Sequence, residues 1–525
     1  MLSRRRAIAE VLEDRRVLAG LVNIDTSTTP GSMTITGDVS SNDIQIVGTA
    51  NPGQFVVTGN STLLRLDGGL QTFGSLTING ITDDLFVALG DGDDSLLLGG
   101  GTTDTEIGFD VTITNQDDDE TTITGVDIGG DLNIGRDDGT GGADAGRSGL
   151  VINESIIRGN LTADNDDGDT LTSITNSEIE GLLSITNGDG DDSTTLVSTT
   201  VGAALFVRPG GPGAVTNPVV AIANGDGSSL TSFTSANDAD ATGNLPTGEL
   251  GRPTIFGGVS IVNGDPLPAG VVVPPPTAGG ATPTELQIAV DIVVFNTADI
   301  LGELNVDNFD GHTETIIVDS VIGADNKSLA DGGYGGSAIV DNGDGYDITL
   351  VENSEIQYGL GINNDTGGTG TWGSQTDIRN VELGGEEGSL GADVALVFNG
   401  DDGDDVVNFV DTTGVSELDG SVTLNLNDGD DSVQMIGVLA AMQIDSVTID
   451  GDEGDDMVYL ENVGIDSMVM ITLDGGVDTL EVRDGVSLPS GLTGTVMLDG
   501  GVGADFYFVN PGVATLENFD IQLLS

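Results

Sequence analysis

The residues of this chain that could most clearly carry chemistry are the aspartates of a repeated Gly-Asp turn. Residues 400–405 read GDDGDD, and similar turns follow at 427–431 (NDGDD) and 451–456 (GDEGDD). Shorter versions occur at 473–478 and 498–505. The last aspartates of the five turns, Asp405, Asp431, Asp456, Asp478 and Asp505, are separated by 26, 25, 22 and 27 residues. A period of this size predicts a stack of similar structural units.

Stacked acidic turns bring like charges together. Adjacent coils of a parallel β-stack lie about 4.8 Å apart, and two carboxylates at roughly that distance repel by about 1 kcal/mol in water. Calcium takes about 6–8 oxygen ligands in flexible geometry, and Gly-Asp turns offer carboxylates and carbonyls. The turns therefore predict a column of Ca²⁺ sites. The expected ligands are Asp401, Asp404, Asp405, Asp428, Asp430, Asp431, Asp452, Asp455, Asp456, Asp474, Asp478, Asp499 and Asp505. The alternative is solvated turns, because Gly and Asp are common in turns.

The last turn resembles a known calcium-binding repeat. Residues 500–508 read GGVGADFYF, which fits the G-G-x-G-x-D-x-U-x nonapeptide of RTX proteins. The resemblance implies that Gly500, Gly501, Gly503 and Asp505 form a calcium loop and that Tyr507 points inward. In RTX proteins the nonapeptides run in tandem, whereas here they come singly. Sites would then be shared between stacked turns along one edge of the fold.

The segments beside the turns have the pattern of β-strands. Val422, Leu424 and Leu426 alternate with polar residues at period two, so that one face is apolar. A single unit is too small to bury that face and must stack on a copy of itself. The sequence therefore predicts an all-β protein, a parallel β-helix with about 25 residues per coil. We expect its coil to be right-handed.

The composition excludes several classes of partner and site. With 86 acidic and 14 basic residues the net charge is −72, so nucleic acid is not an expected partner. The chain has no cysteine, which excludes disulfides, thiolate metal sites and a cysteine nucleophile. No apolar run reaches the roughly 18 residues that a membrane helix needs, so we expect no transmembrane segment.

Four segments follow from changes in pattern along the chain. Residues 1–20 are basic and differ from the rest, residues 21–207 form a first solenoid block, and residues 286–525 form a second block with the acidic turns. Residues 208–285 hold 11 of the 15 prolines. Because proline removes a donor from a β-ladder, we expect an interruption there, either a linker or an excursion from one coil.

The N-terminal segment resembles a sorting motif. Residues 12–19, LEDRRVLA, are similar to the L-E-x-R-x-L-L type motif of large planctomycete surface proteins, with Asp14 where that motif often has Pro. The resemblance implies export, removal of the segment near Ala19–Gly20, and an extracellular or cell-surface location. The alternative interpretation is a basic amphipathic N-terminal helix.

The favoured function is that of an exported, calcium-stabilised β-solenoid with a structural or adhesive role at the cell surface. Its partners would be calcium ions and components of the cell surface or matrix. The rival is a carbohydrate-active enzyme, either a polysaccharide lyase or a hydrolase, since β-helices often carry these activities. A lyase needs a basic residue and the chain has one lysine, Lys327. A hydrolase needs two carboxylates at a defined separation, and among so many acidic residues no pair stands out. No catalytic residue is assigned, and we expect no enzyme.

Overall fold

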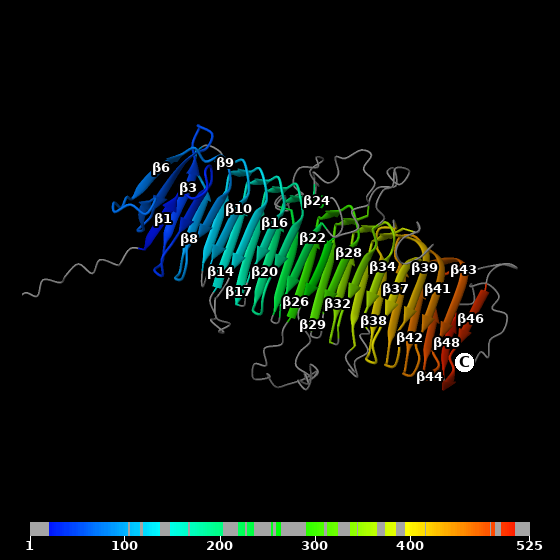
Figure 1. The fold of residues 1–525 in the computed structure, drawn as a ribbon. Coiled ribbons are helices and arrows are strands. Elements are labelled where there is room, and N and C mark those ends of the chain that lie inside the picture. The colour runs from blue at the N-terminus through cyan, green and yellow to red at the C-terminus, as the bar shows by residue number, and fades with distance from the viewer. Residues whose placement is uncertain are drawn as a thin grey trace, which may run out of the picture.

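The chain folds as an elongated parallel β-solenoid in the computed structural model (Figure 1). The structure describes residues 20–102, 105–115, 119–136, 147–165, 168–202, 219–225, 228–235, 254–255, 259–263, 290–308, 312–323, 336–343, 345–364, 373–384, 394–414, 416–483, 485–488, 495–503 and 505–509. Within these ranges every regular element is a strand. The predicted all-β parallel β-helix is confirmed, and its right-handed sense stays a prediction.

One coil consists of three strands. The chain runs through β14 (Arg147–Asn153), β15 (Ile156–Ile157) and β16 (Leu161–Asp164), and then enters β17 (Asp169–Thr175), which pairs in parallel with β14. Repetition of this path builds three ladders along the solenoid. The first and third ladders have strands of four to seven residues through most of the solenoid, whereas those of the second mostly have two.

The first ladder runs the length of the solenoid. At its N-terminal end, β3 pairs antiparallel with β4, which pairs antiparallel with β6. Its strands are β3 (Asp43–Gly48), β4 (Gln54–Gly59), β6 (Ser75–Asn79), β8 (Ser95–Gly99), β11 (Glu120–Thr124), β14, β17, β20 (Asp192–Val197), β23 (Ser229–Thr234), β26 (Val290–Asn296), β29 (His312–Val318), β32 (Ile348–Glu352), β35 (Gln375–Arg379), β38 (Val406–Asp411), β40 (Ser432–Gly437), β42 (Met457–Glu461), β45 (Thr479–Val482) and β48 (Phe506–Val509).

The second and third ladders share one sheet of 28 strands. The second ladder comprises β9 (Thr105–Ile107), β12 (Val126–Ile128), β15, β18 (Glu178–Ile179), β21 (Thr200–Val201), β24 (Thr254–Ile255), β27 (Asp299–Ile300), β30 (Val321–Ile322), β33 (Glu355–Ile356) and β36 (Glu382–Leu383). The third ladder comprises β1 (Leu21–Asp25), β2 (Met33–Thr36), β5 (Leu63–Leu66), β7 (Leu85–Ala88), β10 (Val111–Asn115), β13 (Leu132–Arg136), β16, β19 (Leu183–Thr186), β22 (Val220–Asn224), β25 (Val259–Asn263), β28 (Leu304–Asn308), β31 (Ala338–Asp341), β34 (Leu360–Asn363), β37 (Val394–Asn399) and β46 (Thr495–Asp499).

Toward the C-terminus the second and third ladders merge. The strand β39 (Glu417–Asn425) pairs with both β36 and β37, and β41 (Met442–Asp450) and β43 (Val463–Thr472) continue it. A two-stranded sheet of β44 (Gly475–Gly476) and β47 (Val502–Gly503) lies in the acidic turns. The C-terminal coils are therefore simpler than those before them.

The core follows from the period-two pattern. In β3 the residues Ile44 and Ile46 are fully buried, while their neighbours in the strand face outward. Because coils stack in register, equivalent β-branched and leucine side chains from successive coils form apolar columns inside the solenoid. β-branched residues suit such pleated, half-buried surfaces. The driving force for folding is thus distributed along the whole rod.

A buried asparagine ladder replaces apolar packing at one corner. Each asparagine Nδ2 donates to the Oδ1 of the next, over distances of 2.6–2.9 Å, and most also donate to the threonine seven residues later. The ladder consists of Asn165, Asn187, Asn224, Asn263, Asn308, Asn342 and Asn364. Its members are separated by 22, 37, 39, 45, 34 and 22 residues. The corner therefore stays constant while the coil length varies.

We expect Asn308→Ala to lower the free energy of unfolding by about 1–3 kcal/mol, because it leaves buried partners without hydrogen bonds. Asn308 accepts from Asn263 at 2.7 Å and donates to Asn342 at 2.9 Å. Urea denaturation followed by circular dichroism measures the loss. Asn305→Ala on the outer face of β28 is the matched control and should change stability by less than about 0.5 kcal/mol. Equal effects of the two substitutions would contradict a stabilising ladder.

The proline-rich segment does not end the ladders. The strands β22 to β25 fall within residues 208–285, and each pairs in parallel with strands on both sides. The step from Asn224 to Asn263 is 39 residues and the step to Asn308 is 45, against 22 in the shortest coils. The described strands of this segment therefore belong to the solenoid.

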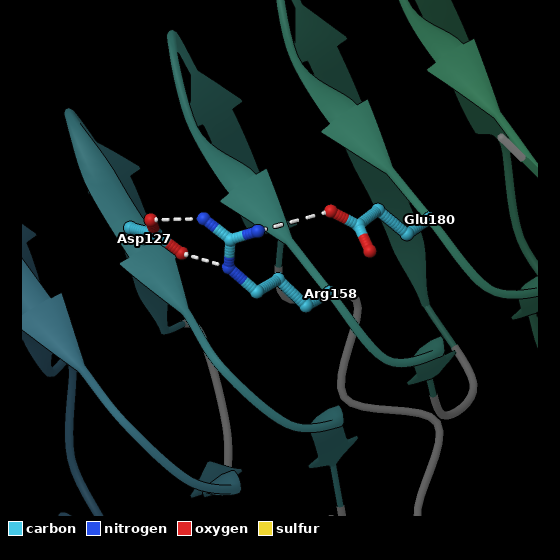
Figure 2. A network of polar contacts seen from close by, with 3 residues as sticks. All are labelled: Asp127, Arg158 and Glu180. Atoms are coloured by element: carbon cyan, nitrogen blue, oxygen red, sulfur yellow. Dashed lines mark hydrogen bonds and ion pairs between the residues drawn. The ribbon is translucent and has the colours of Figure 1, made fainter. Parts of the chain in front are cut away.

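An arginine connects three successive coils on the outer surface. Arg158 donates to both carboxylate oxygens of Asp127, at 3.0 and 2.7 Å, and to Glu180 at 3.2 Å (Figure 2). The three residues lie beside β12, β15 and β18 of the second ladder. The two-pronged contact of a guanidinium with a carboxylate has a defined geometry, so Arg158 helps to hold the register of these coils.

Candidate metal centre

The acidic turns stack in the phase that their spacing predicts. The backbone N–H of Asp405 donates to Oδ1 of Asp431 at 2.7 Å, and the N–H of Asp431 donates to Oδ1 of Asp456 at 3.0 Å. The N–H of Asp456 donates in turn to Oδ1 of Asp478 at 3.0 Å. Each step is one coil, of 26, 25 and 22 residues. The last aspartates of the turns thus form a continuous column.

The thirteen predicted ligands do not share one environment. All but one divide into an inner column, an outer column and a corner group, according to where each lies in the turn. The inner column is Asp405, Asp431, Asp456, Asp478 and Asp505; the outer column is Asp404, Asp430 and Asp455; the corner group is Asp401, Asp428, Asp452 and Asp474. The thirteenth residue, Asp499, ends β46 and lies just before the corner position.

The outer column lies at the surface. The N–H of Asp430 donates to Oδ1 of Asp404 at 3.0 Å, and in the same way the N–H groups of Asp455 and Val477 donate to Oδ1 of Asp430 and of Asp455, both at 2.8 Å. One oxygen of each side chain is thereby fixed by the backbone of the following coil. These residues are exposed, and each directly precedes an inner-column residue.

The corner group contributes to the site that is best placed for a cation. Oxygens of Asp450, Asp452 and Asp474 all lie within 4.8 Å of one another. Asp452 and Asp474 occupy the same position in successive turns, each with positive φ, at 54° and 22°. Asp450 ends β41, so the acidic triad joins two coils. Three carboxylates at this separation are a donor set that suits a hard, oxygen-seeking cation such as calcium.

Asp450 was not among the predicted ligands. It lies two residues before Asp452, at the position that Asn399, Asn425 and Asp499 occupy in other coils. Burial raises the pKa of its carboxyl, and the charges of Asp452 and Asp474 raise it further. A divalent cation among the three oxygens would reverse this repulsion. The signal in the sequence is a polar residue repeated at each strand end, just outside the turn.

The inner column faces away from solvent. Asp405, Asp431, Asp456 and Asp478 are at most 2% exposed, and Oδ2 of each is buried without a hydrogen-bond partner. A Cβ added at Gly400 would lie 1.8 Å from Oδ2 of Asp405. Glycine at that position therefore makes room for the carboxyl. Binding of calcium by these four residues stays a prediction.

Burial and like charges act together on the inner column. Burial raises the pKa of Asp431 to about 9, with Asp405 and Asp456 adding to the shift. The pKa values of Asp405 and Asp456 are raised to about 7, again chiefly by burial. Ionised carboxyls without a partner are costly inside a protein. At neutral pH the carboxyls of the column therefore need either a proton or a bound cation to offset this cost.

The inner column extends far beyond the predicted turns. In register with Asp405, going back along the chain, lie Ser374, Asp347, Thr313, Asp291, Ser229, Asp192 and Thr170. Aspartate thus alternates with a hydroxyl residue in this part, and Asp94 lies in the same column near the N-terminus. These aspartates were not predicted as site residues. The signal was available, because each lies at the start of a strand, at a position with the same parity as the buried residues of that strand.

Comparisons with known proteins add no functional assignment. Within the described part of the chain, no helix is long and apolar enough to cross a membrane. No protein-family model matches the chain, and none of the curated proteins searched is significantly similar to it.

Proposed function

We propose that this protein is an exported structural β-solenoid whose C-terminal acidic turns bind calcium, and that it serves at the cell surface. The single observation that carries the calcium part is the acidic triad of Asp450, Asp452 and Asp474. It lies where two coils meet, so a bound ion would connect the coils as well as neutralise them. The structural part rests on the long, uniform ladders.

Export and surface location are supported by sequence features alone. The motif at residues 12–19 lies outside the described residues. A net charge of −72 and the absence of cysteine suit a protein that gains stability from ions outside the cell. A structural or adhesive role needs a stable, extended surface more than a catalytic pocket, and the solenoid offers such a surface.

The contacts of the basic residues give the enzyme alternative no support. Arg158, Arg379 and Arg483 each form an ion pair with a carboxylate on the outer surface. His312 is half-buried at the start of β29, where its Nδ1 accepts the backbone N–H of Tyr346 at 3.1 Å. The side chain thus contacts the backbone of the next coil. Lys327 lies outside the described residues.

We expect the double substitution Asp452→Asn and Asp474→Asn to remove at least one bound calcium ion from the full chain. Bound calcium at about 100 times its Kd would add about 2.7 kcal/mol to the free energy of unfolding. The double variant should lose this gain, so that calcium raises its melting temperature less than it raises that of the parent. Isothermal titration calorimetry measures the number of ions, and thermal melting with and without chelator measures the stabilisation.

The matched control is Asp466→Asn, an exposed aspartate of β43 outside the acidic turns, which should leave both readouts unchanged. If the double variant binds as many ions as the parent, the triad is not the site. If the parent binds no stoichiometric calcium and chelator leaves its melting temperature unchanged, the calcium proposal is wrong altogether.

A further inference from the structure

A buried carboxyl column runs through the part of the solenoid that precedes the acidic turns. Asp94, Asp192, Asp291 and Asp347 belong to it and are at most 6% exposed. None of them lies in the proposed calcium site or among the predicted ligands. We propose that these side chains are protonated in the folded chain, so that mild acid stabilises the folded solenoid in the absence of calcium.

Two opposing features of the column act on the carboxyl: hydrogen bonds to one oxygen favour its ionised form, and burial of the other oxygen favours its neutral form. Oδ1 of Asp192 accepts the backbone N–H of Thr170 at 3.1 Å and its hydroxyl at 2.7 Å. Oδ1 of Asp347 accepts the same two groups of Thr313 at 3.2 and 2.8 Å. The preceding coil thus donates two hydrogen bonds to Oδ1 of each of these carboxyls. The other oxygen, Oδ2, is buried without a hydrogen-bond partner in both residues and in Asp94.

The charged groups that face these carboxyls are themselves acidic. Asp94 faces Asp119 and Asp38, and Asp192 faces Asp169 and Asp191. Asp347 faces Asp401 and Asp405. For Asp291 the shift comes from burial, opposed by its bonds to Ser229. A lone charge on Oδ2 would therefore be both desolvated and repelled, and a proton removes both penalties.

Burial accordingly raises the pKa of each carboxyl. The pKa is about 7 for Asp94, about 6 for Asp192 and about 8 for Asp347. In the unfolded chain these groups return to an ordinary pKa of about 3.9. Between about pH 4 and pH 8 the folded chain thus binds more protons than the unfolded chain. This contribution to stability is complete below about pH 4 and is lost as the pH rises through the folded values.

The experiment is thermal and urea unfolding of the full chain in chelator at fixed ionic strength, from about pH 8 to about pH 5. The melting temperature of the parent should rise by several degrees as the pH falls. Asp347→Asn and Asp192→Asn keep the Oδ1 acceptor and mimic the protonated side chain. Each should reduce the net proton uptake on folding, given by the pH slope of the unfolding free energy, by up to about one proton.

Asp131→Asn is the matched control. Its Oδ1 accepts the N–H of the next coil, from Asn160 at 2.7 Å, but it lies at the surface. The net proton uptake on folding of this variant should equal that of the parent. Infrared spectra of the folded parent near pH 6 should show the carbonyl band of protonated carboxylic acids, a readout that does not depend on how well a variant folds. Absence of that band, or a melting temperature that does not rise toward acid, would overturn the proposal.

Discussion

Replacing Phe295 by alanine is expected to lower the free energy of unfolding by about 3–5 kcal/mol, the usual loss when a buried phenylalanine is truncated. Phe295 lies in β26 and is fully buried. Its ring stacks on that of Phe233 in β23, the preceding strand of the first ladder, with ring centroids 4.8 Å apart and planes 15° apart. Truncation would leave a cavity and remove the stacking contact between two coils.

The Phe233–Phe295 pair lies where two parts of the first ladder meet. The strands β23 and β26 join the part of the ladder inside residues 208–285 to the block that follows, so loss of the pair should uncouple the two. Urea denaturation by circular dichroism measures the change. Phe86→Ala is the matched control, since its side chain is 39% exposed on β7. A loss of under about 1 kcal/mol at Phe295 would show that the site collapses around the missing ring.

The phase of the acidic turns was predictable because their glycines and aspartates recur at short, nearly constant steps. Asp405, Asp431, Asp456 and Asp478 are joined by backbone hydrogen bonds at the steps read from the sequence. The inward direction of these side chains was predictable as well. Asp405 has the same parity as Val407 and Phe409, which are buried. Treating all aspartates of a turn as one ligand set overlooked this alternation.

The asparagine ladder shows why a search for periods missed part of the fold. Its members are separated by 22 to 45 residues, because insertions of different length enter at the corners. The spacing inside the corner is constant instead, seven residues from Asn187 to Thr194 and from Asn342 to Thr349. Asparagine also recurs at another corner, at Asn176 and Asn353. There a serine connects some coils, as where Ser177 Oγ accepts the N–H of Ser155, and an asparagine pair connects others, as where Asn380 Nδ2 donates to Oδ1 of Asn353 at 3.1 Å.

The proline-rich segment was interpreted as an interruption because proline is excluded from central strands. Its described strands contain no proline, and Val220–Asn224 and Val259–Asn263 have the same alternation as their neighbours. These short apolar runs, at 219–223 and 254–262, are visible in the sequence and favour an interrupted solenoid over a free linker. A solenoid tolerates such insertions because they lengthen a corner without breaking the ladder of the coil.

The second large effect is expected for Gly454→Ala, which should lower the free energy of unfolding by about 3 kcal/mol, at the upper end of what overpacking costs. A Cβ at Gly454 would lie 1.6 Å from the carbonyl oxygen of Gly429 in the preceding turn. Relief requires the two turns to move apart. The N–H of Gly429 would then lose its bond to the carbonyl of Glu453, which is 2.9 Å long. The effect is steric and not one of backbone conformation, because the φ of Gly454 is not positive.

Because Asp452 lies in the same turn as Gly454, displacing that turn should also weaken calcium binding by Asp450, Asp452 and Asp474. Gly475→Ala is the matched control in the next turn, where a Cβ would meet only the side chain of Glu453, at 3.8 Å. It should be tolerated, with less than about 0.5 kcal/mol of destabilisation. Thermal melting in chelator isolates the steric effect, and calcium titration of the folded variants then reports the site. If Gly454→Ala melts like the parent in chelator, the acidic turns do not stack as tightly as the structure shows. If it is destabilised there yet binds calcium with unchanged affinity, the site does not depend on that stacking.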